Sequence, residues 1–332
     1  MGSVLEKLGQ YDIAFDHNTE AKQALLETPR AARCNPNLIL DTIDFCKQAT
    51  TKSSYLSWKR ETINDYIKPP VFIIGFPESG GVLLERLFDT NPDIITTKGA
   101  PIIEDIFQNV EGILNRDVKC PEDIPFFDKY DIAKLRKYYN ERILEFFGKQ
   151  ALDKIIIDKR PMNIIHLLLI HRIFPDSKIL TMIRDPRDVI INCFTELMPA
   201  NDITLNFSTL DNTILLYQRV MDLYLHYKSI MNLKIHEVRF HDLIKDPEVM
   251  MKSLYRYLGF KTPSDKHYKL SQSEIKKIIS INKESVANNL TLDSASMGRW
   301  RHFSCQLVPH LKTLQPYVDT FVSSQENESS SD

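Results

Sequence analysis

The chain has 332 residues, of which 43% are hydrophobic and 26% are charged. This composition is that of a folded globular protein with a large core, and it excludes a disordered or fibrous chain. The 42 Lys and Arg residues and 44 Asp and Glu residues give a net charge of −2, so no overall basic charge points to nucleic acid as a partner.

Cysteine usage and the absence of long apolar runs bear on the compartment of the protein. The cysteines are scattered, and none belongs to a C-x-x-C pair: Cys34, Cys46, Cys120, Cys193 and Cys305. This pattern indicates reduced thiols rather than a disulfide framework or a zinc site. The chain has no run of 18 apolar residues, and its first residues lack the basic and apolar regions of a signal peptide. We therefore predict a cytoplasmic protein with no transmembrane segment.

The N-terminal part of the chain predicts helices. Apolar residues recur at helical spacing within 21–33 and 35–49, which indicates a helical extension over residues 1–68. For the part that follows we expect strands at 71–75 and 94–97, helices at 80–90 and 131–147, and an irregular, proline-containing stretch at 99–130.

The second half of the chain continues the alternation of strands and helices. We expect strands at 154–158, 178–183 and 235–239, helices at 162–174, 189–198, 210–231 and 247–258, a less regular segment at 264–297 and a disordered polar tail at 321–332. The alternation predicts one α/β domain over 69–320 with a mostly parallel sheet. Ligands of such sheets bind at the carboxyl ends of the strands.

The turn after the first strand, Gly75-Phe-Pro-Glu-Ser-Gly80-Gly81-Val82, is the first candidate site. A strand, a glycine turn and a helix N-terminus together bind anions, because backbone N–H groups and the positive end of the helix dipole converge there. Gly75 and Gly80 have the spacing of a Walker A loop, but Gly81 and Val82 replace its Lys and its Ser or Thr. Hydrolysis of a nucleoside triphosphate is therefore disfavoured. The alternative to an anion site is an ordinary turn between a strand and a helix.

The second candidate site follows the strand at 178–183. Arg184 stands at the end of this strand, where a guanidinium group clamps a phosphate well. Asn192 lies about two turns into the next helix. The alternative interpretation is that Arg184 and Asp188 form a structural ion pair.

Six ordered blocks of the sequence resemble the sulfotransferases that use 3′-phosphoadenosine 5′-phosphosulfate (PAPS). They are VFIIGFPESGG, DKRPMN, FPDSKILTMIRDPRDV, VRFHDLIKDPE, LYRYLGF and SMGRWRHF. The blocks span residues 69–315, and they are most similar to the branch of the tyrosylprotein and tetratricopeptide-linked enzymes. The resemblance implies a P-loop-like, three-layer α/β fold. It also implies transfer of a sulfuryl group from PAPS to a hydroxyl or amine acceptor without a metal.

The resemblance also implies roles for individual residues. The loop Glu78, Ser79, Gly80, Gly81 and Val82 corresponds to the segment that binds the 5′-phosphosulfate. Arg184 and Asn192 correspond to 3′-phosphate ligands, Lys159 to the lysine beside the transferred sulfuryl group, and Arg299 and Arg301 to the segment that closes over the nucleotide. Trp300 between them is equally well interpreted as a packing aromatic.

Several positions depart from the family pattern. Glu78 replaces an arginine and reverses a charge beside the expected dianion, while Gly81 and Val82 lack hydroxyl groups that donate hydrogen bonds in the family. Ala100 stands where the tyrosylprotein branch has its glutamate base, and Pro161 where the cytosolic branch has a histidine. Glu104 and Asp105 are nearby in the sequence, and Glu104 is our candidate for a substitute base, although a solvated helix start explains both residues.

These departures leave more than one function open. In the first hypothesis the chain is an active sulfotransferase with a changed donor loop and a relocated base. In the second it is a pseudoenzyme that kept the fold and acts as a binding or interaction protein. A kinase-like phosphate-binding enzyme is disfavoured because the Walker lysine is missing. The acceptor and the oligomeric state cannot be predicted from the sequence.

Overall fold

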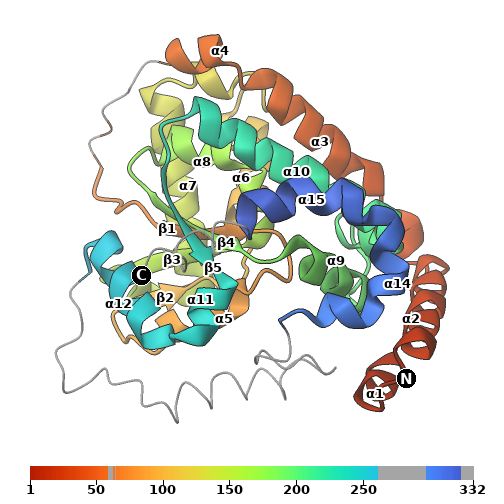
Figure 1. Cartoon of the computed structure of the whole chain (residues 1–332). Coiled ribbons are helices and arrows are strands. Elements are labelled where there is room, and N and C mark those ends of the chain that lie inside the picture. The colour runs from red at the N-terminus through yellow and green to blue at the C-terminus, as the bar shows by residue number, and fades with distance from the viewer. Residues whose placement is uncertain (59–62, 64, 261–296, 323–332) are drawn as a thin grey trace.

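The computed structural model describes residues 1–58, 63, 65–260 and 297–322 (Figure 1). At its centre lies a sheet of five strands in the order β2-β3-β1-β4-β5, and every pairing between neighbours is parallel. The strands are β1 (Val71–Gly75), β2 (Ile94–Thr96), β3 (Ile155–Lys159), β4 (Lys178–Ile183) and β5 (Lys234–Arg239). The parallel α/β architecture expected from the alternation of strands and helices is confirmed.

Helices cover both faces of the sheet, so the fold has three layers (Figure 1). One face carries α6 (Ile102–Leu114), α7 (Lys129–Phe147), α8 (Leu167–Ile173), α9 (Pro186–Thr195) and α10 (Leu210–Ile230). The other carries α5 (Gly81–Asp89), α11 (Phe240–Lys245) and α12 (Pro247–Leu258). Alternate residues of β1 enter the two cores, with Phe72 and Ile74 in the first and Val71 and Ile73 in the second, as the two-residue period of a strand requires.

The N-terminal region is helical, as expected. It contains α1 (Gly2–Lys7), α2 (Tyr11–Leu26), α3 (Pro36–Ala49) and α4 (Lys52–Leu56). The helix α3 lies beside α10, whereas α1 and α2 lie next to the C-terminal segment that begins with the 3₁₀ helix η7 (Arg299–Phe303) (Figure 1). After η7 come α14 (Ser304–Leu307) and α15 (Leu311–Phe321).

The expectation of an irregular stretch at 99–130 was wrong over its first half. Residues 102–114 form α6, which buries Ile102, Ile106 and Val110 against the main core at helical spacing. Pro101 precedes the first turn of this helix and does not interrupt it, because proline is disfavoured only where its missing N–H and its ring disturb a preceding turn.

Two helix boundaries also differ from expectation. The segment expected as one helix over 162–174 consists of the 3₁₀ helix η4 (Pro161–Ile164) followed by α8. The helix expected at 189–198 begins earlier, at Pro186, because the carboxylate of Asp185 caps it by accepting from the N–H of Arg187. The segment expected to be less regular at 264–297 lies almost entirely outside the described residues. The tail expected to be disordered at 321–332 lies outside them from residue 323 onward, but at its start the expectation was wrong, because Phe321 is buried in the last turn of α15.

Candidate functional site

The turn between β1 and α5 lies at the carboxyl edge of the sheet and requires glycine at two positions. A Cβ atom on Gly75 would lie 2.8 Å from the carbonyl oxygen of Met182 on β4. Gly80 has a φ of +100°, and a Cβ atom there would lie 2.3 Å from the ring of Phe240. These close approaches explain both glycines, because only a residue without a side chain fits them.

The helix α5 begins at Gly81 and directs its positive end to this edge. The carbonyl of Gly80 accepts hydrogen bonds from Leu83 and Leu84, so the amides just before them form the first turn. Ser79 beside them is only 3% exposed. A Cβ atom on Gly81 would make ordinary contacts, the nearest with Lys159 Cε at 3.7 Å, so space does not demand a glycine at position 81.

Glu78 adopts a left-handed backbone conformation, with a φ of 64°, in the middle of this turn. Burial raises the pKa of its carboxyl group, and the positive charges of Arg184, Arg299 and Lys159 oppose this effect. The three cations that act on Glu78 are the ones expected to face the donor nucleotide. Glu78, which stands where the family pattern has an arginine, therefore lies among these three cations.

Arg184 is held at the end of β4 and is 7% exposed. Its Nη1 donates to the backbone carbonyl of Glu78 at 3.0 Å, and its guanidinium group lies 4.4 Å from the centre of the Phe240 ring. Burial raises the pKa of the Asp188 carboxyl group and the positive charge of Arg184 opposes this effect, so the two residues attract each other, as in the alternative that we considered. Asp188 also holds the C-terminal segment. Its carboxylate accepts hydrogen bonds from the backbone N–H groups of Gly298 (2.7 Å) and Trp300 (2.9 Å), which fixes the C-terminal segment over α9.

The two hydrogen bonds to Asp188 flank Arg299 in the sequence, and the side chain of Arg299 lies inside the protein. Its Nη1 donates to Asn192 Oδ1 at 2.7 Å and to Thr195 Oγ1 at 3.0 Å, and both acceptors lie on α9. Its opposite edge forms an ion pair with Glu6 of α1. The structure thus brings Arg299 next to Arg184 and Asn192, which lie more than a hundred residues earlier in the sequence.

Arg301 is placed differently from Arg299. It is exposed, and its guanidinium group lies 5.3 Å from the centre of the Trp300 ring. The guanidinium of Arg187 lies 4.0 Å from the same ring. Trp300 therefore contacts two guanidinium groups and is itself partly buried against the main core, which is what a packing aromatic does.

Lys159 ends β3, next to the central strand, and is 8% exposed. Its Nζ forms an ion pair with Glu85 of α5 at 3.4 Å. Its backbone N–H donates to Thr97 Oγ1 at 3.0 Å. The lysine is thereby fixed beneath the helix whose N-terminus follows the glycine turn.

Glu104 lies in the first turn of α6 and forms an ion pair with Arg160, the residue after Lys159. A second nitrogen of Arg160 donates to the carbonyl of Gly99 at 2.9 Å. The candidate base is therefore held on the side of the sheet where β3 ends, and its carboxylate has a positively charged partner.

Glu6 and Glu85, the acidic partners of Arg299 and Lys159, were not among the residues predicted from the sequence. Glu85 carried a detectable signal, because it stands at a buried position of a helix whose neighbours Leu84 and Phe88 belong to the core. A charged residue at such a position usually has a partner. Glu6 carried no such signal, because only the fold brings residues 6 and 299 together.

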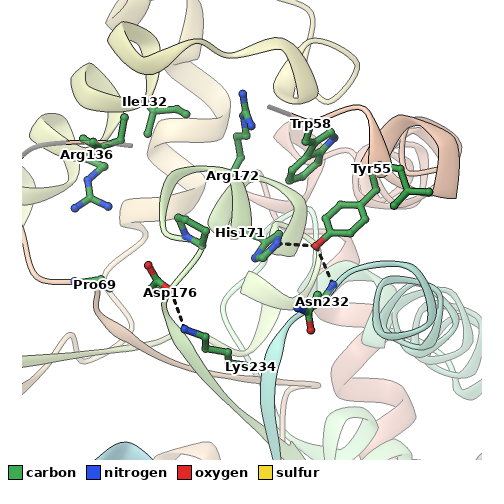
Figure 2. A pocket seen from close by; sticks show the side chains of 13 residues that line it. Tyr55, Trp58, Pro69, Ile132, Arg136, His171, Arg172, Asp176, Asn232 and Lys234 are labelled. Carbon is green, nitrogen blue, oxygen red and sulfur yellow. Dashed lines mark hydrogen bonds and ion pairs between the residues drawn. The ribbon is translucent and has the colours of Figure 1, made fainter. Parts of the chain in front are cut away.

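A cavity of about 700 Å³ lies at the opposite edge of the sheet (Figure 2). Pro69, Asp176 and Lys234, which line it, stand at or just before the starts of β1, β4 and β5. A hydrogen bond joins Tyr55 to His171, and Lys234 Nζ lies 2.7 Å from Asp176 Oδ1. Because the glycine turn and the basic residues stand at the carboxyl ends of the strands, this cavity is separate from them.

Two further findings concern the described part of the chain. Within it, no group of three or more His, Cys, Asp or Glu side chains is arranged to hold a metal ion. None of its helices is both long enough and apolar enough to span a membrane.

Comparison with known proteins identifies the family. Residues 69–264, more than half of the chain, match the family model described as "Sulfotransferase family". The chain therefore belongs to the sulfotransferase family, as the six sequence blocks predicted.

Individual relatives are distant. The chain is 23% identical to the omega-hydroxy-beta-dihydromenaquinone-9 sulfotransferase Stf3 of Mycobacterium bovis over 58% of its own length and 63% of that protein. It is 22% identical to protein-tyrosine sulfotransferase 2 of Gallus gallus, over 58% of the chain and 51% of that protein. The chain spans less than two thirds of the length of these curated relatives.

Among solved structures, the sulfotransferase STF9 of Mycobacterium avium matches 90% of this chain and 88% of its own. The TM-score of this match is 0.48, and the sequence identity is 13%.

Proposed function

We propose that this chain is an active sulfotransferase that takes PAPS as its donor and transfers the sulfuryl group to a hydroxyl or amine acceptor. The observation that carries the proposal is the convergence of Arg184, Arg299 and Lys159 on the glycine turn at the carboxyl edge of the sheet. Such a concentration of cations at a helix N-terminus suits a ligand with several anionic groups.

Each part of the site then has a chemical task. The amides of Gly81 and Val82 and the hydroxyl of Ser79 bind the 5′-phosphosulfate, while Arg184, Asn192 and Arg299 bind the 3′-phosphate. During transfer the bond between sulfur and the bridging phosphate oxygen breaks as the acceptor oxygen or nitrogen bonds to sulfur. Negative charge builds on the bridging oxygen, where the ammonium group of Lys159 stabilises it.

The acceptor must lose a proton in this step, and we assign the role of general base to Glu104. Its carboxylate lies on the first turn of α6 and forms an ion pair with Arg160. Arg160 directly follows Lys159 in the chain, so the ion pair brings Glu104 near the lysine. For Glu104 to take the proton, Arg160 has to release part of this carboxylate when the acceptor binds. Glu104→Gln should leave binding of 3′-phosphoadenosine 5′-phosphate (PAP) unchanged and abolish transfer from radiolabelled PAPS to any acceptor that the wild type accepts.

The position of Glu78 favours a second candidate function, that of a pseudoenzyme that binds a partner without transferring sulfate. Burial of this carboxyl group among Arg184, Arg299 and Lys159 supplies a negative charge where the nucleotide would bring its own. In this alternative the carboxylate of Glu78 offsets the positive charge of these three residues, and PAPS does not bind.

Calorimetric titration with PAP separates the two functions, because PAP is the stable product and requires no acceptor. Micromolar binding that is lost in Arg184→Ala supports the proposed donor site. The matched control is Arg219→Ala, which removes a guanidinium group whose ion pair with Asp44 lies at the surface. A folded wild-type protein that binds no PAP at millimolar concentration would overturn the proposal and leave the pseudoenzyme.

A further inference from the structure

We propose that Glu6 is a specificity-determining residue that competes with the 3′-phosphate of the nucleotide for Arg299. This inference rests on the proposed function. It adds that α1, outside the part of the chain that resembles the family, controls how strongly the site prefers a 3′-phosphorylated nucleotide over an unphosphorylated one.

The geometry of the ion pair carries the argument. Glu6 Oε2 accepts from Arg299 Nε at 3.1 Å and from Nη2 at 2.7 Å, and Oε1 accepts from Nη2 at 2.7 Å. This edge of a guanidinium group, formed by Nε and one terminal nitrogen, is the edge that binds carboxylate and phosphate with two parallel hydrogen bonds. The carboxylate of Glu6 thus already occupies the edge that a phosphate would use.

The remaining contacts of Arg299 hold it in place whether or not Glu6 is present. Its Nη1 donates to Asn192 and Thr195, which are neutral and belong to α9. The side chain of Arg299 is only 8% exposed, and that of Glu6 is 18% exposed. An incoming phosphate therefore has to displace Glu6, because two anions cannot share one buried guanidinium edge without strong repulsion.

The helix α1 can leave at little cost in buried surface. Gly2 is its only buried residue, and Val4 and Leu8 on or beside it are 51% and 66% exposed. The helix α2 is anchored independently, since Tyr11 stacks on His302 with 4.2 Å between ring centres. Displacement of α1 thus exposes little apolar surface and leaves α2 attached to the C-terminal segment.

The test compares PAP with adenosine 5′-monophosphate, which lacks the 3′-phosphate, in titrations of the full chain. We expect Glu6→Gln to bind PAP more tightly by at least about fivefold, the lower end of typical coupling between two sites. Binding of adenosine 5′-monophosphate should not change. Glu20→Gln is the matched control, because it removes the same charge from an exposed side chain of the neighbouring helix.

Hydrogen exchange of the wild-type protein tests the inference without a variant. PAP should increase amide exchange in residues 2–8, because it releases α1, whereas adenosine 5′-monophosphate should not. If Glu6 instead positioned Arg299 for the nucleotide, Glu6→Gln would weaken PAP binding and PAP would protect α1, and either result overturns the inference. Equal PAP affinities of wild type and Glu6→Gln would overturn it while leaving the donor site in place. Absence of PAP binding to both would overturn the proposed function as well.

Discussion

Lys159 and Glu85 form an ion pair inside the protein, with 3.4 Å between Lys159 Nζ and Glu85 Oε2 and both side chains largely buried. Glu85 also accepts a hydrogen bond from the backbone N–H of Lys98 at 3.0 Å. The pair links the end of β3 to α5, the helix that follows the glycine turn. Two parts of the proposed donor site are therefore held together by a charge pair whose acidic member, Glu85, lies outside the six family blocks.

Glu85→Gln should lower the free energy of unfolding by about 3 kcal/mol, because it leaves the ammonium group of Lys159 buried without its counter-charge. Urea denaturation measures this change. Glu248→Gln is the control, since its pair with Lys252 is exposed and should contribute less than about 0.5 kcal/mol. The double variant Lys159→Met with Glu85→Gln should recover part of the lost stability. Equal effects of the Glu85 and Glu248 substitutions would show that the buried pair does not stabilise the fold.

The two adjacent glycines of the turn should respond differently to substitution. Gly80→Ala should destabilise the protein by more than about 1 kcal/mol, because of its positive φ and the contact of 2.3 Å with the Phe240 ring. Gly81→Thr should fold normally and bind PAP about fivefold more tightly, because it adds a hydroxyl donor worth about 1 kcal/mol. Thermal unfolding and PAP titration test the pair. A Gly81→Thr protein that unfolds as easily as Gly80→Ala would contradict the geometry of the turn.

Glu78 should make nucleotide binding depend on pH. Burial raises the pKa of its carboxyl group, so protonation begins at a higher pH than for an exposed glutamate and removes the negative charge next to the ligand. PAP binding should therefore tighten as the pH falls from neutrality towards the range in which Glu78 takes up its proton. Glu78→Gln should bind PAP more tightly at pH 7 and lose this part of the pH dependence. An unchanged pH profile in the variant would exclude Glu78 as its source.

Asp158 and His166 should give the stability of the protein two opposing pH dependences. Burial raises the pKa of Asp158 from 3.8 to about 7, although Tyr139 donates a hydrogen bond to its carboxylate. The folded protein therefore binds a proton there that the unfolded chain releases. This contribution to stability is complete below about pH 4 and is lost as the pH rises to about 7, on the order of 4 kcal/mol in total.

For His166 the sign is reversed. Burial and the charge of Arg160 lower its pKa from 6.5 to about 3, so the unfolded chain binds the extra proton between these values. Its contribution to stability is complete above about pH 6.5 and is lost as the pH falls towards about 3. In the wild type the two slopes largely cancel between about pH 4 and 6.5.

Single substitutions should reveal each slope. Asp158→Asn should become more stable with rising pH over this range because His166 remains, and His166→Gln should become less stable because Asp158 remains. Urea denaturation at several pH values measures both slopes. Slopes of the same sign in the two variants would contradict the assignment.

Most of the strands and helices, and their order, follow from local patterns in the sequence. The continuous apolar run at 71–75, the glycine turn after it and the cap of α12 at Gly259 are local patterns, and β1, the turn and the end of that helix are found where they were expected. Local patterns gave a wrong prediction where two of them pointed to different structures. The prolines of 99–130 suggested irregular structure, but burial of one apolar face made residues 102–114 a helix, since tertiary packing outweighs weak local preferences.

The pairing of charged side chains, by contrast, depends on how the chain folds. The sequence motifs point to Lys159, Arg184 and Arg299 as site residues. They do not show that Lys159 pairs with Glu85 or that Arg299 pairs with Glu6. Ion pairs depend on distance in space, and the parallel crossovers of the sheet bring residues from opposite ends of the chain to one edge. The composition of the site is therefore a property of the sequence, whereas its electrostatic balance is a property of the fold.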